Sequence, residues 1–187
     1  MPLTTLDPAT ALILIDLQHG IVALPTAHAS ADVVQRANML ADAFRSHDLP
    51  VVLVNVSGAP AGRVEQPCST AGRPANWSDL VPALNPQPQD HRVTKRSWGA
   101  FTATDLDVYL KQRGVTQVVI AGIATSMGVE STARQAHELG YNVTLATDAM
   151  TDTSVDVHLN SLTRVFPKIA ETGSTQAIIE LLGHPLA

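Results

Sequence analysis

The stretch QVVIAGIATSMGVESTARQAHELG, residues 117–140, joins an apolar strand directly to a helix. The run Val118–Ala121 is continuously apolar, which is typical of a strand buried on both faces. The helix that follows ends at Gly140. The first backbone N–H groups of a helix have no partner inside it and favour negative charge. The turn at residues 122–128 is therefore a candidate place for chemistry.

Apolar strands alternate with segments of helical period along the whole chain. Strands are expected at residues 11–15, 51–56, 92–95, 117–121, 142–146 and 168–171. Helices are expected at residues 31–48, 105–113, 155–166 and 175–182, and in the segment that ends at Gly140. This alternation predicts a parallel sheet covered by helices on both faces. We expect a single domain over residues 1–187.

Composition argues against several classes of partner. The chain has 187 residues, a formal charge of −5 and 4% aromatic residues, so nucleic acid and anionic membranes are not expected as partners. Its apolar runs are far shorter than a membrane span, and no signal peptide is expected. The only cysteine, Cys68, is interpreted as a passive thiol in a reducing compartment, and we expect a cytoplasmic protein.

Three polar features follow predicted strands. Asp16 ends the first strand, Lys95 ends the third, and the 122–128 turn ends the fourth. Ligands of open α/β sheets bind beyond the carboxyl ends of the strands, so these features should converge. Taken singly, each has an ordinary alternative: a turn residue, a surface charge and a glycine used for backbone geometry. Residues 57–90, rich in Pro, Gly and Ser, are long for a connector and suggest a binding loop or lid.

Four segments occur in an order that is similar to a known family. They are LILIDLQ at 12–18, KRSWGAF at 95–101, GIATSMGVESTARQAHELGY at 122–141 and DAMTD at 148–152. The chain resembles the isochorismatase-like (cysteine hydrolase) superfamily from about residue 8 to residue 182. The resemblance implies a Rossmann-like, three-layer α/β/α fold with a six-stranded parallel sheet in the order 3-2-1-4-5-6.

The resemblance also implies a set of catalytic residues. The family's Asp and Lys match Asp16 and Lys95, but its nucleophilic Cys falls on Gly128. Without that thiolate no acyl-enzyme can form there. Isochorismatases proper share this departure and hydrolyse a vinyl ether, which needs a proton donor and water. The family's non-proline cis peptide matches Ile123–Ala124, and the N–H groups of Ala124 and Gly128 are candidates to stabilise an oxyanion.

These observations predict a hydrolase that acts on a vinyl ether or C–N bond of a small molecule by Asp/Lys acid–base catalysis. Whether Asp16 acts as acid or base stays open, because burial raises and Lys95 lowers the pKa of its carboxyl. An inactive binding or regulatory module is the alternative. Further substrate contacts are expected from Gln18, Trp98, Ala124 and Thr125. We expect no cofactor, and the family implies a homo-oligomer, either a dimer or a tetramer.

Other residues have competing interpretations. Ser126 is expected to cap the helix rather than act as nucleophile, and Phe101 either walls the pocket or packs in the core. No metal is expected, because the segment NVSGAPAGR after the second strand lacks the family's Asp-x-His pair. A second cation for an anionic substrate would come from the arginines around the long loop, which are Arg63, Arg73, Arg92 and Arg96.

Overall fold

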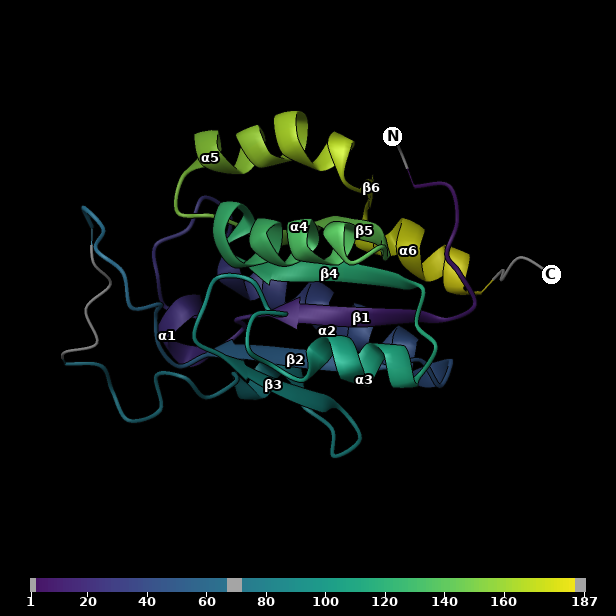
Figure 1. The fold of residues 1–187 in the computed structure, drawn as a ribbon, viewed down its shortest axis with the longest axis horizontal. Coiled ribbons are helices and arrows are strands. Elements are labelled where there is room, and N and C mark those ends of the chain that lie inside the picture. Colours follow the sequence, from purple (N-terminus) through teal and green to yellow (C-terminus); the bar gives the residue numbers. More distant parts are fainter. Residues whose placement is uncertain (1–2, 67–71, 184–187) are drawn as a thin grey trace.

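Six parallel strands form one sheet in the computed structural model, which describes residues 3–66 and 72–183. The order β3-β2-β1-β4-β5-β6 confirms the predicted topology. The strands are β1 (Thr10–Ile15), β2 (Val51–Val56), β3 (His91–Lys95), β4 (Gln117–Ile123), β5 (Asn142–Thr151) and β6 (Glu171–Gly173). The arrowheads of β1 and β4 point toward the side where α1 and the long loop lie (Figure 1).

The helices alternate with these strands. They are α1 (His19–Val22), α2 (Ser30–Ser46), α3 (Leu106–Gln112), α4 (Glu130–Glu138), α5 (Val155–Asn160) and α6 (Thr175–Leu182). A π-helical turn, Thr125–Val129, precedes α4, and another, Ser161–Val165, continues α5. In the described part of the chain, no helix combines the length and the apolarity that crossing a membrane requires.

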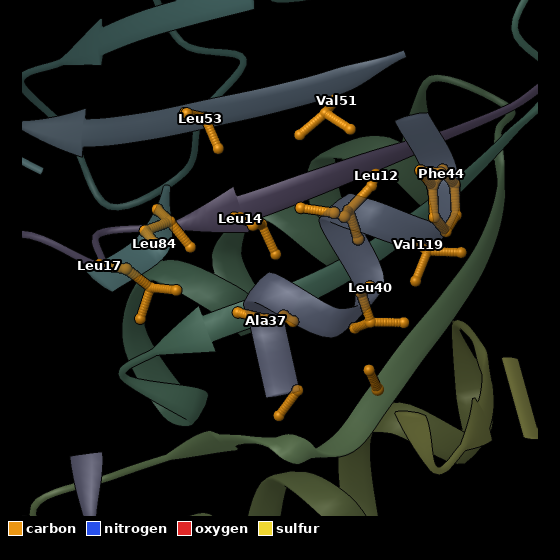
Figure 2. Close-up of a cluster of buried hydrophobic side chains, with 14 of the residues drawn as sticks. Leu12, Leu14, Leu17, Ala37, Leu40, Phe44, Val51, Leu53, Leu84 and Val119 are labelled. Carbon is orange, nitrogen blue, oxygen red and sulfur yellow. The ribbon is translucent and has the colours of Figure 1, made fainter. Parts of the chain in front are cut away.

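Two apolar layers hold the helices against the sheet. Leu12 and Leu14 of β1 point toward α2, where they meet Leu40 and Phe44 (Figure 2). The alternate residues of β1, such as Ile13, belong to the opposite layer with α3 and α4. A strand with apolar residues on both faces is what a doubly covered parallel sheet requires. The unbroken apolar run of β1 thus explains its central position.

Most predicted elements are found within a few residues of their expected bounds. The last strand is an exception, because it lies at Glu171–Gly173 rather than at residues 168–171. The chain first completes a 3-10 turn at Phe166–Lys168, where Pro167 lacks a backbone N–H for the sheet. Two short pieces were not predicted: α1 and the 3-10 turn Pro82–Leu84.

The long loop packs on the segment that leaves β1. The N–H groups of His19 and Gly20 donate to the carbonyls of Asp79 and Trp77, each at 2.9 Å. Gly20 permits this contact, because a Cβ at that position would overlap the Trp77 ring. The loop is therefore attached beside Asp16 on its described part, while Cys68 lies outside the described residues.

Candidate active site

A buried ion pair joins the ends of two strands that are not neighbours. Lys95, the last residue of β3, donates from Nζ to Asp16 Oδ2 at 2.7 Å, and also to the Ser97 carbonyl at 3.1 Å. Asp16 is 5% exposed and Lys95 is 2% exposed. The strand between them contributes as well, because the Asp16 N–H donates to the Val54 carbonyl of β2 at 2.9 Å. The predicted meeting of acid and cation is present.

Asp16 is placed by an uncommon backbone conformation. Its φ of +54° lies in the left-handed region, which Asp tolerates better than most residues. Such conformations persist where the surrounding structure enforces them, and they are frequent at functional sites. In this conformation the Asp16 carboxylate accepts the hydrogen bond of Lys95.

Burial dominates the electrostatics of the pair. It raises the pKa of the Asp16 carboxyl from 3.8 to about 6, although the charge and hydrogen bond of Lys95 act in the opposite direction. Asp16 Oδ1 is also buried, and no described residue donates a hydrogen bond to it. Asp16 can therefore exchange a proton near neutral pH through an oxygen that the described protein leaves unoccupied.

Gly128 faces this pair. A Cβ at Gly128 would lie 3.2 Å from Asp16 Oδ2 and 3.7 Å from Lys95 Nζ. It would also lie 2.8 Å from Cγ2 of Ile15, which is closer than real side chains approach one another. The structure thus brings Asp16, Lys95 and residue 128 together, and it leaves little room for a side chain at residue 128. The Ile15 contact means that adding a side chain at residue 128 requires the Ile15 side chain or the turn to shift.

The turn between β4 and α4 approaches β1 closely. Gly122 has a φ of +127°, and a Cβ there would overlap the Ile15 carbonyl. The next peptide bond, Ile123–Ala124, is cis, as the resemblance implied. The Ala124 carbonyl then accepts hydrogen bonds from the N–H groups of Met127 and Val129, both at 3.2 Å. This geometry presents Gly128 to the acid.

The segment after β3 is tied to α4. The Ala100 N–H donates to Thr132 Oγ1 and the Phe101 N–H donates to Gln135 Oε1, both at 3.1 Å. Phe101 stacks on Tyr141 at 5.9 Å and packs against the core, so the structure favours its core-packing interpretation. Trp98, in contrast, is 59% exposed on this loop. Its ring is accessible to a ligand from solvent.

Two of the sequence-based interpretations need correction. Gln18 is fully buried, and its amide binds backbone: Nε2 donates to the Val56 and Trp77 carbonyls, and Oε1 accepts from the Val56 N–H. It therefore holds the long loop against β1 and β2 rather than facing a substrate. Ser126 does not cap the helix with its side chain; it lies within the π-helical turn, and its N–H donates to Asp152 Oδ2 at 2.7 Å.

The remaining predicted contacts differ in exposure. Ala124 is half-buried, whereas Thr125 is buried and its Oγ1 lies 2.8 Å from His158 Nδ1. Sequence reasoning missed the roles of Asp152 and His158. Asp152 is the last residue of DAMTD, one of the segments that carry the family resemblance, so its position could have indicated a role. Nothing in the sequence pairs His158 with the turn.

The candidate arginines are exposed or stacked on the long loop, and the described residues form no metal cluster. Three of the four candidate arginines, Arg63, Arg92 and Arg96, are exposed, and Arg73 stacks over the Trp77 ring at 3.7 Å. Within residues 3–66 and 72–183, no group of three His, Cys, Asp or Glu side chains is arranged to hold a metal ion. The site therefore consists of one acid, one cation and a glycine turn.

The sequence profile of the isochorismatase domain matches residues 10–177. The chain belongs to the isochorismatase family. The matched region includes every strand of the sheet, Asp16, Lys95 and Gly128. The isochorismatase domain thus accounts for the fold and for the whole candidate site.

Two isochorismatase family proteins are similar to nearly the whole chain, and a hydrolase is similar to part of it. The uncharacterized isochorismatase family protein YwoC of Bacillus subtilis is 43% identical over 178 residues, 91% of this chain and 93% of YwoC. A solved isochorismatase family protein from Burkholderia thailandensis is 44% identical with a TM-score of 0.92, covering 96% of this chain and 98% of that one. Streptothricin hydrolase of Streptomyces noursei is 36% identical over 143 residues, 74% of this chain and 48% of that enzyme.

Proposed function

We propose that this member of the isochorismatase family hydrolyses a small molecule without a covalent nucleophile. The observation that carries the proposal is the buried Asp16–Lys95 pair facing Gly128. Burying two charges is costly, and a site without a reaction or ligand has no need of it. Because residue 128 has no side chain, we propose that Asp16 supplies the acid–base chemistry and that water, rather than a protein side chain, attacks the substrate.

A vinyl ether is the bond that suits a proton donor best. Asp16 would give its proton to the terminal alkene carbon, which leaves an oxocarbenium ion. Water then adds to the cationic carbon, and its proton passes to the Asp16 carboxylate. The resulting hemiketal breaks into a carbonyl compound and an alcohol, and Asp16 ends the cycle protonated. The raised pKa of Asp16 supports this assignment as the acid.

Lys95 supports that cycle without entering it. Its ammonium lies against Asp16 and stabilises the carboxylate that forms when the proton leaves. Its second hydrogen bond, to the Ser97 carbonyl, fixes the ammonium at the end of β3. The exposed ring of Trp98 and the neighbouring Arg96 are our candidates for contacts with an apolar and an anionic part of the substrate.

Hydrolysis of a C–N bond is the second candidate reaction, suggested by the similarity to the ureidoacrylate amidohydrolase RutB of Caulobacter vibrioides, which is 42% identical over 71 residues, 38% of this chain and 32% of RutB. It would need ionised Asp16 as a base that takes a proton from water. The N–H groups of Ala124 and Gly128 would then stabilise the oxyanion. A binding module without turnover is the remaining alternative, supported by the missing nucleophile at Gly128.

The test compares hydrolysis of isochorismate and of a panel of small amides by wild type and by Asp16→Asn. Asp48→Asn is the matched control, because Asp48 also has a positive φ, of +56°, but is exposed and distant in sequence from the site. We expect isochorismate turnover that is lost in Asp16→Asn and kept in Asp48→Asn. Amide turnover with the same dependence would favour the base mechanism. Binding of isochorismate without turnover of any compound would refute the proposed hydrolysis.

We also propose that the chain forms a homo-oligomer. Three apolar side chains on α5, Val155, Val157 and Leu159, are 41–48% exposed. Exposing this apolar surface to water is unfavourable, and association with a second copy would bury it. Light scattering would give the mass directly. A monomer at micromolar concentration would contradict this proposal and would leave the proposed chemistry unaffected.

A further inference from the structure

A buried histidine lies behind the turn that presents Gly128. His158 of α5 is 5% exposed, and its Nδ1 is 2.8 Å from Oγ1 of Thr125, a fully buried residue that begins the π-helical turn. The hydrogen bond is therefore shielded from water on both sides. Because water does not compete for the two atoms, this hydrogen bond is strong and constrains the position of the turn.

Two side chains from the same segment hold consecutive residues of the turn. Asp152, just after β5, accepts from the Ser126 N–H at 2.7 Å, and His158 binds the side chain of Thr125. The α5 segment is in turn anchored on α4, because Ser161 Oγ donates to Glu130 Oε2 at 2.6 Å. In Figure 1, α5 runs alongside α4 on the same side of the sheet. The turn is thus held by side chains other than those of the Asp16–Lys95 pair.

His158 is kept neutral by its surroundings. Burial lowers the pKa of its imidazole, the neighbouring ring of His28 lowers it further, and Asp152 opposes them. The two rings meet edge to face with centroids 4.9 Å apart. A neutral imidazole has one donor and one acceptor nitrogen, so Nδ1 can accept a hydrogen bond from the Thr125 hydroxyl. The pair can therefore be satisfied without a buried charge.

We infer that His158 is a positioning residue that acts through Thr125 to fix the turn at residues 124–128 against Asp16 and Lys95. The inference rests on the proposed function, since the turn is useful only if its N–H groups and Gly128 face the reacting bond. His158 itself would not touch the substrate. Its loss would misplace the turn, and misplacement of about 1 Å can reduce the rate by about 100-fold.

The kinetic test uses variants that remove or preserve the atom that binds Thr125. His158→Leu and Thr125→Val each remove the hydrogen bond, whereas His158→Asn can present an amide atom close to the position of Nδ1. We expect the first two to lower kcat by about 10- to 100-fold with little change in KM, and His158→Asn to recover most of the rate. A double variant, His158→Leu with Thr125→Val, should cost no more than either single change.

Three results with the same variants would overturn the inference. Multiplicative losses in the double variant would show that His158 does not act through Thr125. A His158→Asn variant as slow as His158→Leu, or a change in KM alone, would also overturn the inference. Should His158→Leu fail to fold, the nearly isosteric Thr125→Val, with Thr125→Ser as its matched control, carries the same comparison.

A second readout separates this inference from the proposed function. Hydrogen exchange of the amides at residues 124–129, followed by mass spectrometry, reports the mobility of the turn whether or not a substrate is turned over. We expect faster exchange there in His158→Leu and Thr125→Val, near wild-type exchange in His158→Asn, and no change in β1. If wild type hydrolyses nothing, the proposed function fails while exchange still decides the inference. Unchanged exchange of the turn in both apolar variants would overturn it.

Discussion

Raising the pH through 6 should switch off the proposed hydrolysis, because Asp16 must carry a proton to act as donor. Its pKa is raised from 3.8 to about 6, and a shift of this size corresponds to about 3 kcal/mol in favour of the protonated form. With that pKa, the carboxyl is about 90% protonated at pH 5 and about 1% protonated at pH 8. We expect kcat/KM to be level below about pH 5 and to fall about tenfold per unit above about pH 7.

Replacing Lys95 tests the cause assigned to that pKa. The charge and the hydrogen bond of Lys95 both lower the pKa of Asp16, so Lys95→Met removes them and should move the pKa upward. The falling limb of kcat/KM should then shift to higher pH, even though the rate itself declines. The assay is a pH series of kcat/KM for both proteins, with the Asp16 carboxyl followed by carbon NMR and identified by its absence in Asp16→Asn.

Two results would refute this reasoning. A kcat/KM that rises with pH through 6 would identify Asp16 as a base and would exclude the vinyl ether mechanism. A limb that stays in place or moves to lower pH in Lys95→Met would show that the ammonium does not set the pKa of the acid. The NMR titration gives the same answer in the absence of a substrate, so it tests the electrostatics separately from the chemistry.

Three further changes test the geometry around the pair. Gly128→Ala should lower the free energy of unfolding by about 1–3 kcal/mol in urea titrations and lower kcat/KM, because the new Cβ would meet Ile15 Cγ2 at 2.8 Å. Gly122→Ala should lower the free energy of unfolding by more than about 3 kcal/mol, because the new Cβ would overlap the backbone of Ile15 at a φ of +127°. Gly114→Ala is the control: its φ is +66°, but the space around it is open, so the loss should be about 1 kcal/mol. Equal losses in the two variants would contradict this explanation. Gln18→Leu should lower the free energy of unfolding by about 1–3 kcal/mol and make the chain around Trp77 more sensitive to limited proteolysis, because it leaves buried backbone groups unpaired.

The central strands of the sheet could be predicted from the sequence because they are local apolar runs, whereas the short polar strand β6 was misplaced. Apolar runs of five or six residues were enough to predict β1 and β2. The order of the strands in the sheet followed from the family resemblance. The meeting of Asp16, Lys95 and residue 128 followed from the rule that parallel strands end at one edge. These parts depend on short-range patterns that the sequence displays directly.

The side-chain hydrogen bonds could not be predicted in the same way. Gln18 binds Val56 and Trp77, which are 38 and 59 residues away, so no local pattern indicates that its amide is fully used. The position of Ser126 at a helix start suggested capping, but Asp152 supplies the acceptor from another strand end. No role was predicted for His158, because its contact with Thr125 depends on how α5 packs.

The glycine at residue 128 also determines which reagents can inactivate the site. The thiolate of a cysteine hydrolase is open to alkylation and to oxidation through sulfenic to sulfonic acid. The pair described here consists of a carboxyl and an ammonium, and the turn that faces it offers only hydrogen at residue 128. Hydrolysis at this site would therefore persist in iodoacetamide or peroxide at doses that silence relatives with a catalytic thiol.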